Sequence, residues 1–313
     1  MSAEITIRAM VEGDLEEADR VFRRAFGTFF GLPDPMNFRG DAGLIDSRWH
    51  SYPDGGVVAA RDGTMIGFSF ASQWGSLGVF GPVAVLPEYW KQGIARQMLG
   101  PTLDIFARRQ SRMVGLFTFP QSAMHLRLYQ DFGFWPRFLT PILAKPIAGP
   151  HRVPGAIALS TASDRAVHVD ACRDLTESIY DGLDLGGEIA NVLDRGLGDT
   201  ILLREDGAVA GFAVCHSGAG SEGGSQSCYI KFGLVRSGDG AAARLARLVA
   251  ACEDFARARG VDQISAGVST GRHEAYRAML GMGFRIQLPG VTMHRPYVEG
   301  YDRPDVFALE DWR

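Results

Sequence analysis

The residues of this sequence that could do chemistry begin in the segment 86–99, LPEYWKQGIARQML. An apolar strand pattern ends before it, and an amphipathic helix pattern follows it. The start of a helix leaves backbone N–H groups unpaired at the positive end of the helix dipole, where they can bind a phosphate. Gly93 can adopt backbone angles closed to other residues, and Lys91 and Arg96 would offer two cations to a pyrophosphate. A glycine here would also suit a plain connecting turn, so the segment alone leaves both interpretations open.

Composition and charge place the chain among ordinary globular proteins. Hydrophobic residues make up 46% of its 313 residues, and the formal net charge of −4 argues against a broad nucleic-acid-binding surface. The sequence has no apolar run of about 18 residues and no signal-peptide pattern, so we expect no membrane partner and a cytoplasmic location. The cysteines form no C-x-x-C pair, which favours reduced, buried thiols and no metal site. They are Cys172, Cys215, Cys228 and Cys252.

Two similar halves are indicated by three features that recur in the same order. Each half has an Asp-Gly pair typical of a tight hairpin turn, then a helical pattern, then a Gly-Phe pair. The copies are separated by 144, 149 and 150 residues, which points to a duplicated fold. The features are Asp-Gly at 62–63 and 206–207, helix ends near Phe106 and Phe255, and Gly-Phe at 133–134 and 283–284.

The proline-rich segment 141–159, PILAKPIAGPHRVPGAIAL, separates the two halves. Repeated prolines disfavour a helix or an interior strand, so we predict a linker here. The boundary is placed so that the domains are 1–148 and 149–313. In each half, strand patterns come first and strand–helix–strand patterns follow, which predicts a mixed, mainly antiparallel central sheet flanked by helices. The predicted fold class is therefore α/β, with two tandem domains.

Several motifs of the first half occur together. The window 90–95, WKQGIA, fits the pattern Gln/Arg-x-x-Gly-x-Gly/Ala at Gly93 and Ala95, although Trp90 departs from it. The opening ITIRAMVEGDLEEA, the hairpin RDGTMIGF and a Tyr-x-x-x-Gly-Phe element at 129–134 accompany it. In this combination the first half resembles the GNAT superfamily of acetyl-coenzyme A-dependent N-acetyltransferases. The resemblance implies two tandem GNAT-like domains, because the second half repeats the first.

The resemblance also implies acetyl-coenzyme A as co-substrate and a site in the first half. The strand before the loop would splay from its neighbour and offer backbone groups around Val83 and Val85 to the pantetheine arm and the thioester carbonyl. Tyr129 takes the position of the family's general acid. A phenol near the sulfur can protonate the leaving thiolate, and its pKa of about 10 lies above the roughly 8.5 of a thiol. Tyr129 could instead be a plain core residue. The pyrophosphate would lie on Lys91, Gln92, Gly93, Ile94, Ala95 and Arg96.

A general base and a second complete site do not emerge from the resemblance. The strand GVFGPVAV carries no acidic residue, and Glu88 and His125, which lie near the motif, are predicted to be surface residues. In the second half the loop VRSGDGAAARLARL keeps two glycines but is shorter. Met279 stands where the first half has Tyr129, and a thioether cannot donate a proton. The second half is therefore predicted to be degenerate.

These observations predict an N-acetyltransferase that moves an acetyl group from acetyl-coenzyme A to a primary amine of a small molecule or peptide. Direct attack in the first domain is expected. The alternatives are the same chemistry in the second domain, or a non-catalytic sensor that binds an acyl-coenzyme A. The glycine- and serine-rich stretch around Glu222 would be a flexible hairpin loop or a substrate loop. The tail with Tyr301 and Trp312 is expected to pack as a strand or lid between the domains.

Overall fold

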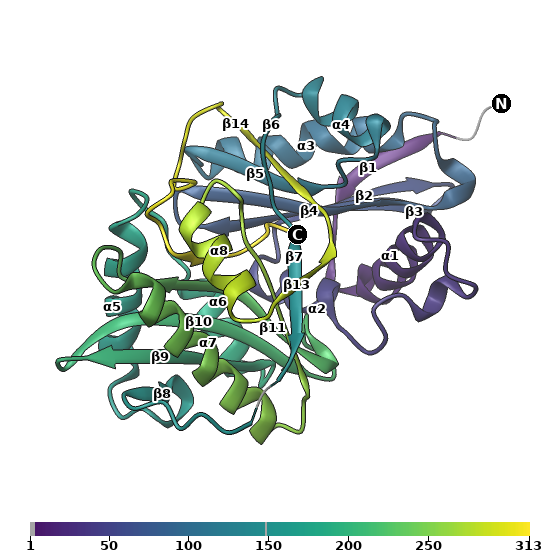
Figure 1. The fold of residues 1–313 in the computed structure, drawn as a ribbon. Helices are drawn as coiled ribbons and strands as arrows, with labels where there is room; N and C mark the ends of the chain where they lie inside the picture. Colours follow the sequence, from purple (N-terminus) through teal and green to yellow (C-terminus); the bar gives the residue numbers. More distant parts are fainter. Residues whose placement is uncertain (1–3, 148) are drawn as a thin grey trace.

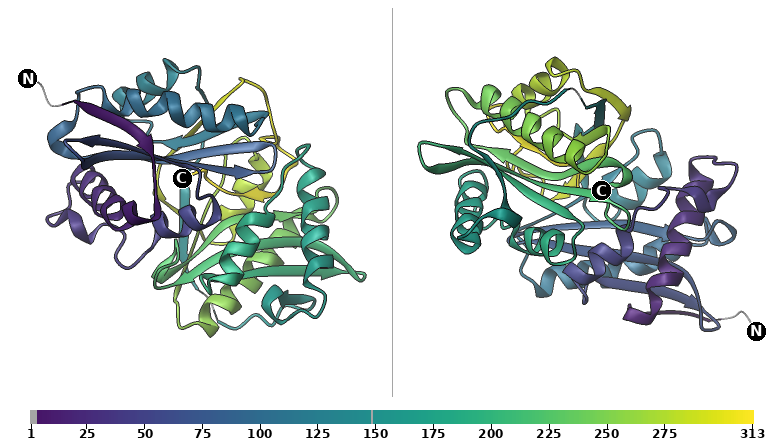
Figure 2. Two further views of the ribbon diagram at one scale, coloured as in Figure 1. Left: turned by 180° about the vertical axis from the view of Figure 1, so that it is seen from behind. Right: turned by 90° about the horizontal axis from the view of Figure 1, so that it is seen from below.

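Two β-sheets lie side by side in the molecule, and helices flank each of them (Figure 1, Figure 2). The computed structural model describes residues 4–147 and 149–313. In both sheets most neighbouring strands are antiparallel and one described pair is parallel. This arrangement confirms the predicted α/β fold class. None of the described helices has the length and apolar character needed to cross a membrane.

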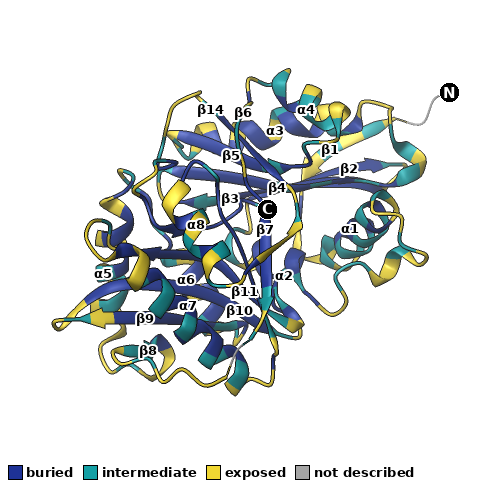
Figure 3. Cartoon of the chain, in the orientation of Figure 1, coloured by how far each residue is buried: buried dark blue, intermediate teal, exposed yellow. Residues whose placement is uncertain are grey.

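The first sheet is covered by two helices on each face. α1 (Leu15–Phe29) and α2 (Leu44–Ser51) pack on one face, and α3 (Ile94–Arg108) and α4 (Ala123–Gln130) pack on the other. The helix faces that meet the sheet are buried, while the outer faces are exposed (Figure 3). The strands in spatial order are β1 (Ile5–Ala9), β2 (Gly56–Arg61), β3 (Thr64–Trp74), β4 (Leu77–Val85), β5 (Met113–Thr118), β14 (Val291–Arg295) and β6 (Trp135–Leu139).

The second sheet repeats this layering. α5 (Arg165–Glu177) and α6 (Gly186–Asp194) cover one face, and α7 (Ala241–Ala258) and α8 (His273–Gly281) cover the other. The strands in spatial order are β13 (Arg285–Leu288), β7 (Ile142–Pro146), β12 (Gln263–Gly267), β11 (Gly224–Val235), β10 (Ala208–Gly218), β9 (Gly198–Glu205) and β8 (Ala156–Ala158), and β15 (Ala308–Leu309) also pairs with β11.

The two halves of the chain exchange one strand each. β14, from the second half, lies between β5 and β6 of the first sheet, and β7, from the first half, lies between β13 and β12 of the second. In Figure 1 the yellow β14 accordingly lies among the blue strands. The prediction of a linker over 141–159 is therefore wrong for β7, whose prolines are tolerated because Pro141 precedes the strand and Pro146 ends it. The division at residues 148/149 stays a prediction, and each half on either side of it contributes a strand to the other half's sheet.

The repeated hairpins form as expected. Asp62 and Gly63 have φ values of 51° and 80°, and Asp206 and Gly207 have 50° and 82°. Positive φ at both central positions matches the twist of antiparallel strands, so these turns join β2 to β3 and β9 to β10 directly.

A hydrophobic core continues from one sheet to the other. Trp74 of β3 and Leu77 of β4 share a buried cluster with Leu183 and Phe232 from the second half. The Trp74 indole donates to the Glu188 carboxylate at 2.9 Å, which satisfies its buried N–H. The two halves therefore share one continuous buried core.

Candidate functional site

β4 and β5 run side by side over their first residues and then separate. Val79 and Gly115 are the last paired positions, although β4 continues to Val85 and β5 to Thr118. On its other side β4 stays paired with β3 as far as Val85. The separation opens a wedge, and along it the β4 edge has no strand partner among the described residues.

The free edge of β4 presents backbone polar groups to this wedge. The Leu86 N–H donates to the Ile66 carbonyl at 2.9 Å, so Leu86 bonds toward β3. Because bonding alternates along an antiparallel pair, Val83 and Val85 turn their N–H and C=O groups to the wedge. The Trp90 indole donates to the Val85 carbonyl at 2.7 Å from that side. Trp90, the departure from the loop pattern, thus holds the loop against the strand.

The start of α3 lies directly after a left-handed glycine. Gly93 has φ 76° and is followed by Ile94, the first helical residue. A Cβ at Gly93 would meet nothing within 4 Å, so the backbone here is open to a ligand. The backbone N–H groups of residues 91–96 have no hydrogen-bond acceptor within the described part of the chain. A run of unpaired amides at the positive end of a helix is an anion-binding arrangement.

The charged side chains around this loop are not equivalent. Arg96 forms an ion pair with Asp131, which also pairs with Arg127 at 2.8 Å. Lys91 is exposed and has φ 63°, and none of the described carboxylates forms an ion pair with it. Gln92 turns away from the helix start, because its side-chain amide donates to the Glu88 carbonyl at 3.0 Å. Lys91 therefore offers the least neutralised cation at the helix start.

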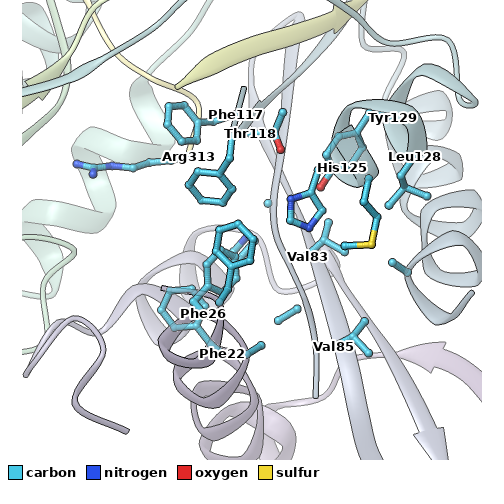
Figure 4. Close-up of a pocket in the computed structure, with 18 of the residues that line it drawn as sticks. Phe22, Phe26, Val83, Val85, Phe117, Thr118, His125, Leu128, Tyr129 and Arg313 are labelled. Atoms are coloured by element: carbon cyan, nitrogen blue, oxygen red, sulfur yellow. The ribbon is translucent and has the colours of Figure 1, made fainter. Parts of the chain in front are cut away.

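A cavity of about 510 Å³ connects the wedge, the loop and the inner side of α1 (Figure 4). The predicted site residues come together here, with the exception of Gln92, which is not among the lining residues. Those that line the cavity are Val83, Val85, Lys91, Gly93, Ile94, Ala95, Arg96 and Tyr129.

Tyr129 enters the cavity from α4. Its side chain is 7% exposed and packs edge-on against Phe80 of β4, with ring centroids 5.7 Å apart. Burial raises the pKa of the Tyr129 phenol, so the hydroxyl stays protonated across the physiological range. A buried phenol beside a free strand edge can donate its proton to a leaving group placed there.

His125 lies one helical turn before Tyr129, and its prediction as a surface residue is wrong. The imidazole lines the cavity between Phe29 and Phe119, with ring centroids 5.4 and 6.2 Å away. Figure 4 shows His125 and Tyr129 pointing from α4 toward Val83. The spacing of four residues between them could have indicated a shared helix face, but not that this face borders a cavity.

The far wall of the cavity is aromatic, which the sequence analysis did not anticipate. Phe22, Phe26 and Phe29 of α1 line it, together with Phe30, which directly follows the helix, and Phe38 from the next segment. Their spacing places the α1 residues on one side of the helix, a pattern equally typical of a core face. The aromatic wall gives one end of the cavity a strongly apolar character.

The chain matches known proteins in sequence and in fold. Residues 18–134 match the sequence model of the acetyltransferase (GNAT) family. A protein from Pyrococcus horikoshii, named for a proposed acetyltransferase activity, is 14% identical and superposes with TM-score 0.73 over 98% of this chain and 95% of its own. The chain has a GNAT acetyltransferase fold. A GCN5-related N-acetyltransferase from Sphaerobacter thermophilus is 15% identical, with TM-score 0.63 over 93% and 95% of the two chains. No curated protein matches the sequence.

The second half contains a counterpart of the wedge beside β4, and the chain itself fills it. β11 and β12 are parallel neighbours as far as Ile230 and Ala266 and then separate. Along the free part of β11, Leu309 of β15 pairs with Gly233, and Ala308 pairs with Leu234. By its register with the preceding hairpin strand, Gly233 corresponds to Val83 of the first half. The expected tail strand is thus confirmed, and it covers the edge that the first half leaves free.

Two further features distinguish this second GNAT-like wedge. Gly240 has φ 78° before α7, as Gly93 has before α3, but the next amide, of Ala241, donates to the Gly238 carbonyl at 3.0 Å. Met279, at the position equivalent to Tyr129, is fully buried in the core. The second half therefore keeps the turn geometry of the first, but one amide of its helix start is occupied and a buried thioether replaces the phenol.

Glu222 belongs to a buried ionic cluster and is not among the cavity-lining residues. Its carboxylate pairs with Arg48 of α2 at 3.2 Å and with Lys231 of β11 at 2.5 Å. These cations, which outweigh the effect of burial, hold the pKa of Glu222 well below its usual value. The hairpin tip is thus anchored to the first half through a fully buried residue.

Proposed function

We propose that this protein transfers an acetyl group from acetyl-coenzyme A to a primary amine, in the cavity between β4, α3 and α4. The observation that carries the proposal is the run of unpaired amides at residues 91–96 beside the free edge of β4. The GNAT fold and the family match over residues 18–134 support the reaction class.

The chain's own groups suit this co-substrate. The amides of residues 91–96 and the cation of Lys91 would hold the pyrophosphate, and Arg96 would add charge beside it. The outward backbone groups of Val83 and Val85 would bond the pantetheine arm as a neighbouring strand does. Coenzyme A supplies the activated acetyl group as a thioester.

The transfer needs one proton donor and one proton acceptor. The amine lone pair forms a C–N bond with the thioester carbonyl carbon, and the C–S bond breaks. The sulfur leaves with the bonding electron pair and takes a proton from the Tyr129 hydroxyl, and the nitrogen loses the extra proton that it carries. Tyr129 is placed for the donor step because its buried phenol is protonated before the reaction begins.

The covered wedge of the second half argues against activity there. Along this edge the Val235 N–H donates to the Phe307 carbonyl at 3.2 Å and Gly233 pairs with Leu309, at the positions that correspond to Val85 and Val83. Binding in the GNAT manner would require this strand to leave a buried position, since Ala308 and Leu309 are both 0% exposed.

A matched pair of glycine variants tests where the co-substrate binds. Gly93→Leu and Gly240→Leu each place a side chain at a left-handed helix start, with φ values of 76° and 78°, so their conformational costs are similar. Calorimetry with acetyl-coenzyme A should show at least a tenfold loss of affinity for Gly93→Leu and wild-type affinity for Gly240→Leu. The reverse result would move the site to the second half. Tight binding without turnover of any amine would instead identify a sensor.

A further inference from the structure

The apolar end of the cavity is built from rings in mutual contact. Phe38 stacks on Phe26 and on Phe30, with centroids 5.7 and 5.5 Å apart. Phe119, which follows β5, contacts Phe29 and Phe30 at 5.0 and 5.4 Å. Such a wall favours an apolar, ring-sized group over a flexible polar chain. An apolar ring can stack on the wall and displace water from it, whereas a polar chain would lose hydrogen bonds to water there.

A single arginine interrupts this wall. Arg39 directly follows Phe38 and lines the same cavity. One guanidinium nitrogen donates to the backbone carbonyl of Glu222 at 2.5 Å. In the described part of the structure no carboxylate forms an ion pair with Arg39.

The other cations near Arg39 already have carboxylate partners. Arg48 and Lys231 share Glu222, and Lys231 also binds a second carboxylate, that of Glu188, at 2.8 Å. Arg313, which also lines the cavity, pairs with a neighbouring carboxylate at 3.3 Å and lies over the ring of Tyr229. Burial, and then the positive charge of Arg313, lower the pKa of Arg39 to about 10, although the nearby charges of Glu222 and Asp311 act in the opposite direction, so the guanidinium remains charged at neutral pH. A half-buried guanidinium that lines a cavity, and that no described carboxylate contacts directly, can bind the anionic group of a ligand.

We propose that the acceptor is a primary amine that carries an apolar, ring-sized body and an anionic group, and that Arg39 binds the anion. The inference rests on the proposed function, because it names the substrate class of the same cavity. The aromatic wall would hold the body, and Arg39 would fix its orientation so that the amine faces Tyr129. Arg39 is a specificity residue in this arrangement, and it takes no part in the transfer.

Paired probes that differ only in charge test this assignment. 4-(Aminomethyl)benzoate is compared with 4-(aminomethyl)benzamide, and phenylalanine with phenylalaninamide, by kcat/KM with saturating acetyl-coenzyme A. The wild type should prefer the acid of at least one pair by tenfold or more. Arg39→Gln should lower kcat/KM for that acid by at least tenfold and leave its amide within about threefold. Arg24→Gln removes an exposed arginine of α1 that lies outside the cavity lining, and should change neither.

The outcomes separate the inference from the function on which it depends. If acetyl-coenzyme A binds and neutral amines are acetylated as well as acids, or if Arg39→Gln slows acid and amide equally, the acceptor assignment is overturned. If acetyl-coenzyme A does not bind, the proposed function itself fails. Thermal unfolding and acetyl-coenzyme A affinity of Arg39→Gln establish that the variant is folded, and Arg39→Lys, which keeps the charge, should recover part of the acid preference.

A second inference has an independent basis in His125. The Nδ1 atom of this imidazole is buried and has no hydrogen-bond partner among the described groups. The rings that flank it, Phe29 and Phe119, do not titrate, and Tyr129 one turn further along α4 stays protonated. Burial lowers the pKa of His125, so the ring is neutral at pH 7 and can accept a proton. We infer that His125 takes the proton that the acceptor nitrogen must lose to form the C–N bond, and returns it to solvent.

The pH dependence of turnover tests this role. His125→Gln should lower kcat by tenfold or more with little change in KM or acetyl-coenzyme A affinity. The wild-type kcat profile should contain a limb with an apparent pKa below 6.5 that the variant lacks. Added imidazole should restore part of the activity of His125→Ala. A variant with unchanged kcat, or a variant that keeps the limb, would remove His125 from the mechanism.

Discussion

Leu309 pairs with Gly233 at the register position that Val83 leaves free in the first half. The same strand edge is thus covered by the chain in one half and open to solvent and ligand in the other. The cavity accordingly lies along the strand edge of the first half, and Leu288, Trp312 and Arg313 of the second half contribute to its lining.

Replacing Tyr129 with phenylalanine should slow the reaction without loosening the co-substrate. The ring would keep its packing on Phe80, while the proton for the departing sulfur would be lost. We expect kcat to fall about tenfold or more, with coenzyme A affinity near the wild-type value. Single-turnover kinetics and calorimetry check this, and an unchanged rate would show that Tyr129 is a core residue.

Replacing Lys91 with methionine should weaken acetyl-coenzyme A binding in a salt-dependent way. Lys91 is exposed, so its attraction to a pyrophosphate is worth about 1 kcal/mol, or roughly fivefold in affinity at low ionic strength. The loss should shrink in about 0.5 M salt. Arg108→Met, at the opposite end of α3, makes the same charge change away from the loop and serves as the control. Equal losses in both variants would rule out a local role for Lys91.

The tail should depend on one buried arginine for its position. Arg272, which directly precedes α8, is fully buried and pairs with Asp302 at 3.2 Å and with Glu310, which directly follows β15. Arg272→Met leaves both carboxylates buried without a cation, so we expect a loss of about 3–5 kcal/mol in the free energy of unfolding.

An exposed pair on the same helix provides the comparison. Arg277 pairs with Glu274 at the surface, and Arg277→Met should cost less than about 1 kcal/mol. Urea unfolding measures both variants, and limited proteolysis shows whether the tail is released. Similar stabilities for the two variants would mean that the buried ion pair does not hold β15 in place.

Acid should destabilise the protein through His216. Burial lowers the pKa of this imidazole to about 4, below the roughly 6.5 of an unfolded chain. Between these values the unfolded state binds a proton that the folded state does not, so the contribution is complete above pH 6.5 and is lost as the pH falls toward 4. Between pH 7 and 4.5, the wild type should lose about 2 kcal/mol more than His216→Gln. Urea unfolding at the two pH values measures both proteins. If the wild type and His216→Gln lose the same free energy of unfolding, His216 is not held neutral in the folded state.

The sequence predicted those features that depend on a few neighbouring residues. The Asp-Gly pairs specified both hairpins, and Gly93 marked the start of α3, because positive φ is a local requirement. The side-chain roles were harder to foresee. Whether His125 faces solvent or a cavity depends on where Phe29 and Phe119 lie, and these come from other elements.

Local sequence patterns also could not predict which strands would be neighbours in the sheets. The sequence of β7 reads as apolar residues between prolines, and nothing in it says that its neighbours are β12 and β13. The covered wedge was missed for the same reason, since Leu309 and Gly233 are far apart in sequence. Arg39 carried no signal at all, because a lone arginine after a phenylalanine is usually a surface residue.

The exchange of β7 and β14 bears on how the protein is made. During synthesis the ribosome releases the first half well before residues 291–295, and until then β5 and β6 lack the strand that lies between them. The sheet of a nascent first half therefore lacks β14 until more than a hundred further residues have been added. Cutting the gene at the middle should give two fragments that are each insoluble alone and that recover the folded protein when they are produced together.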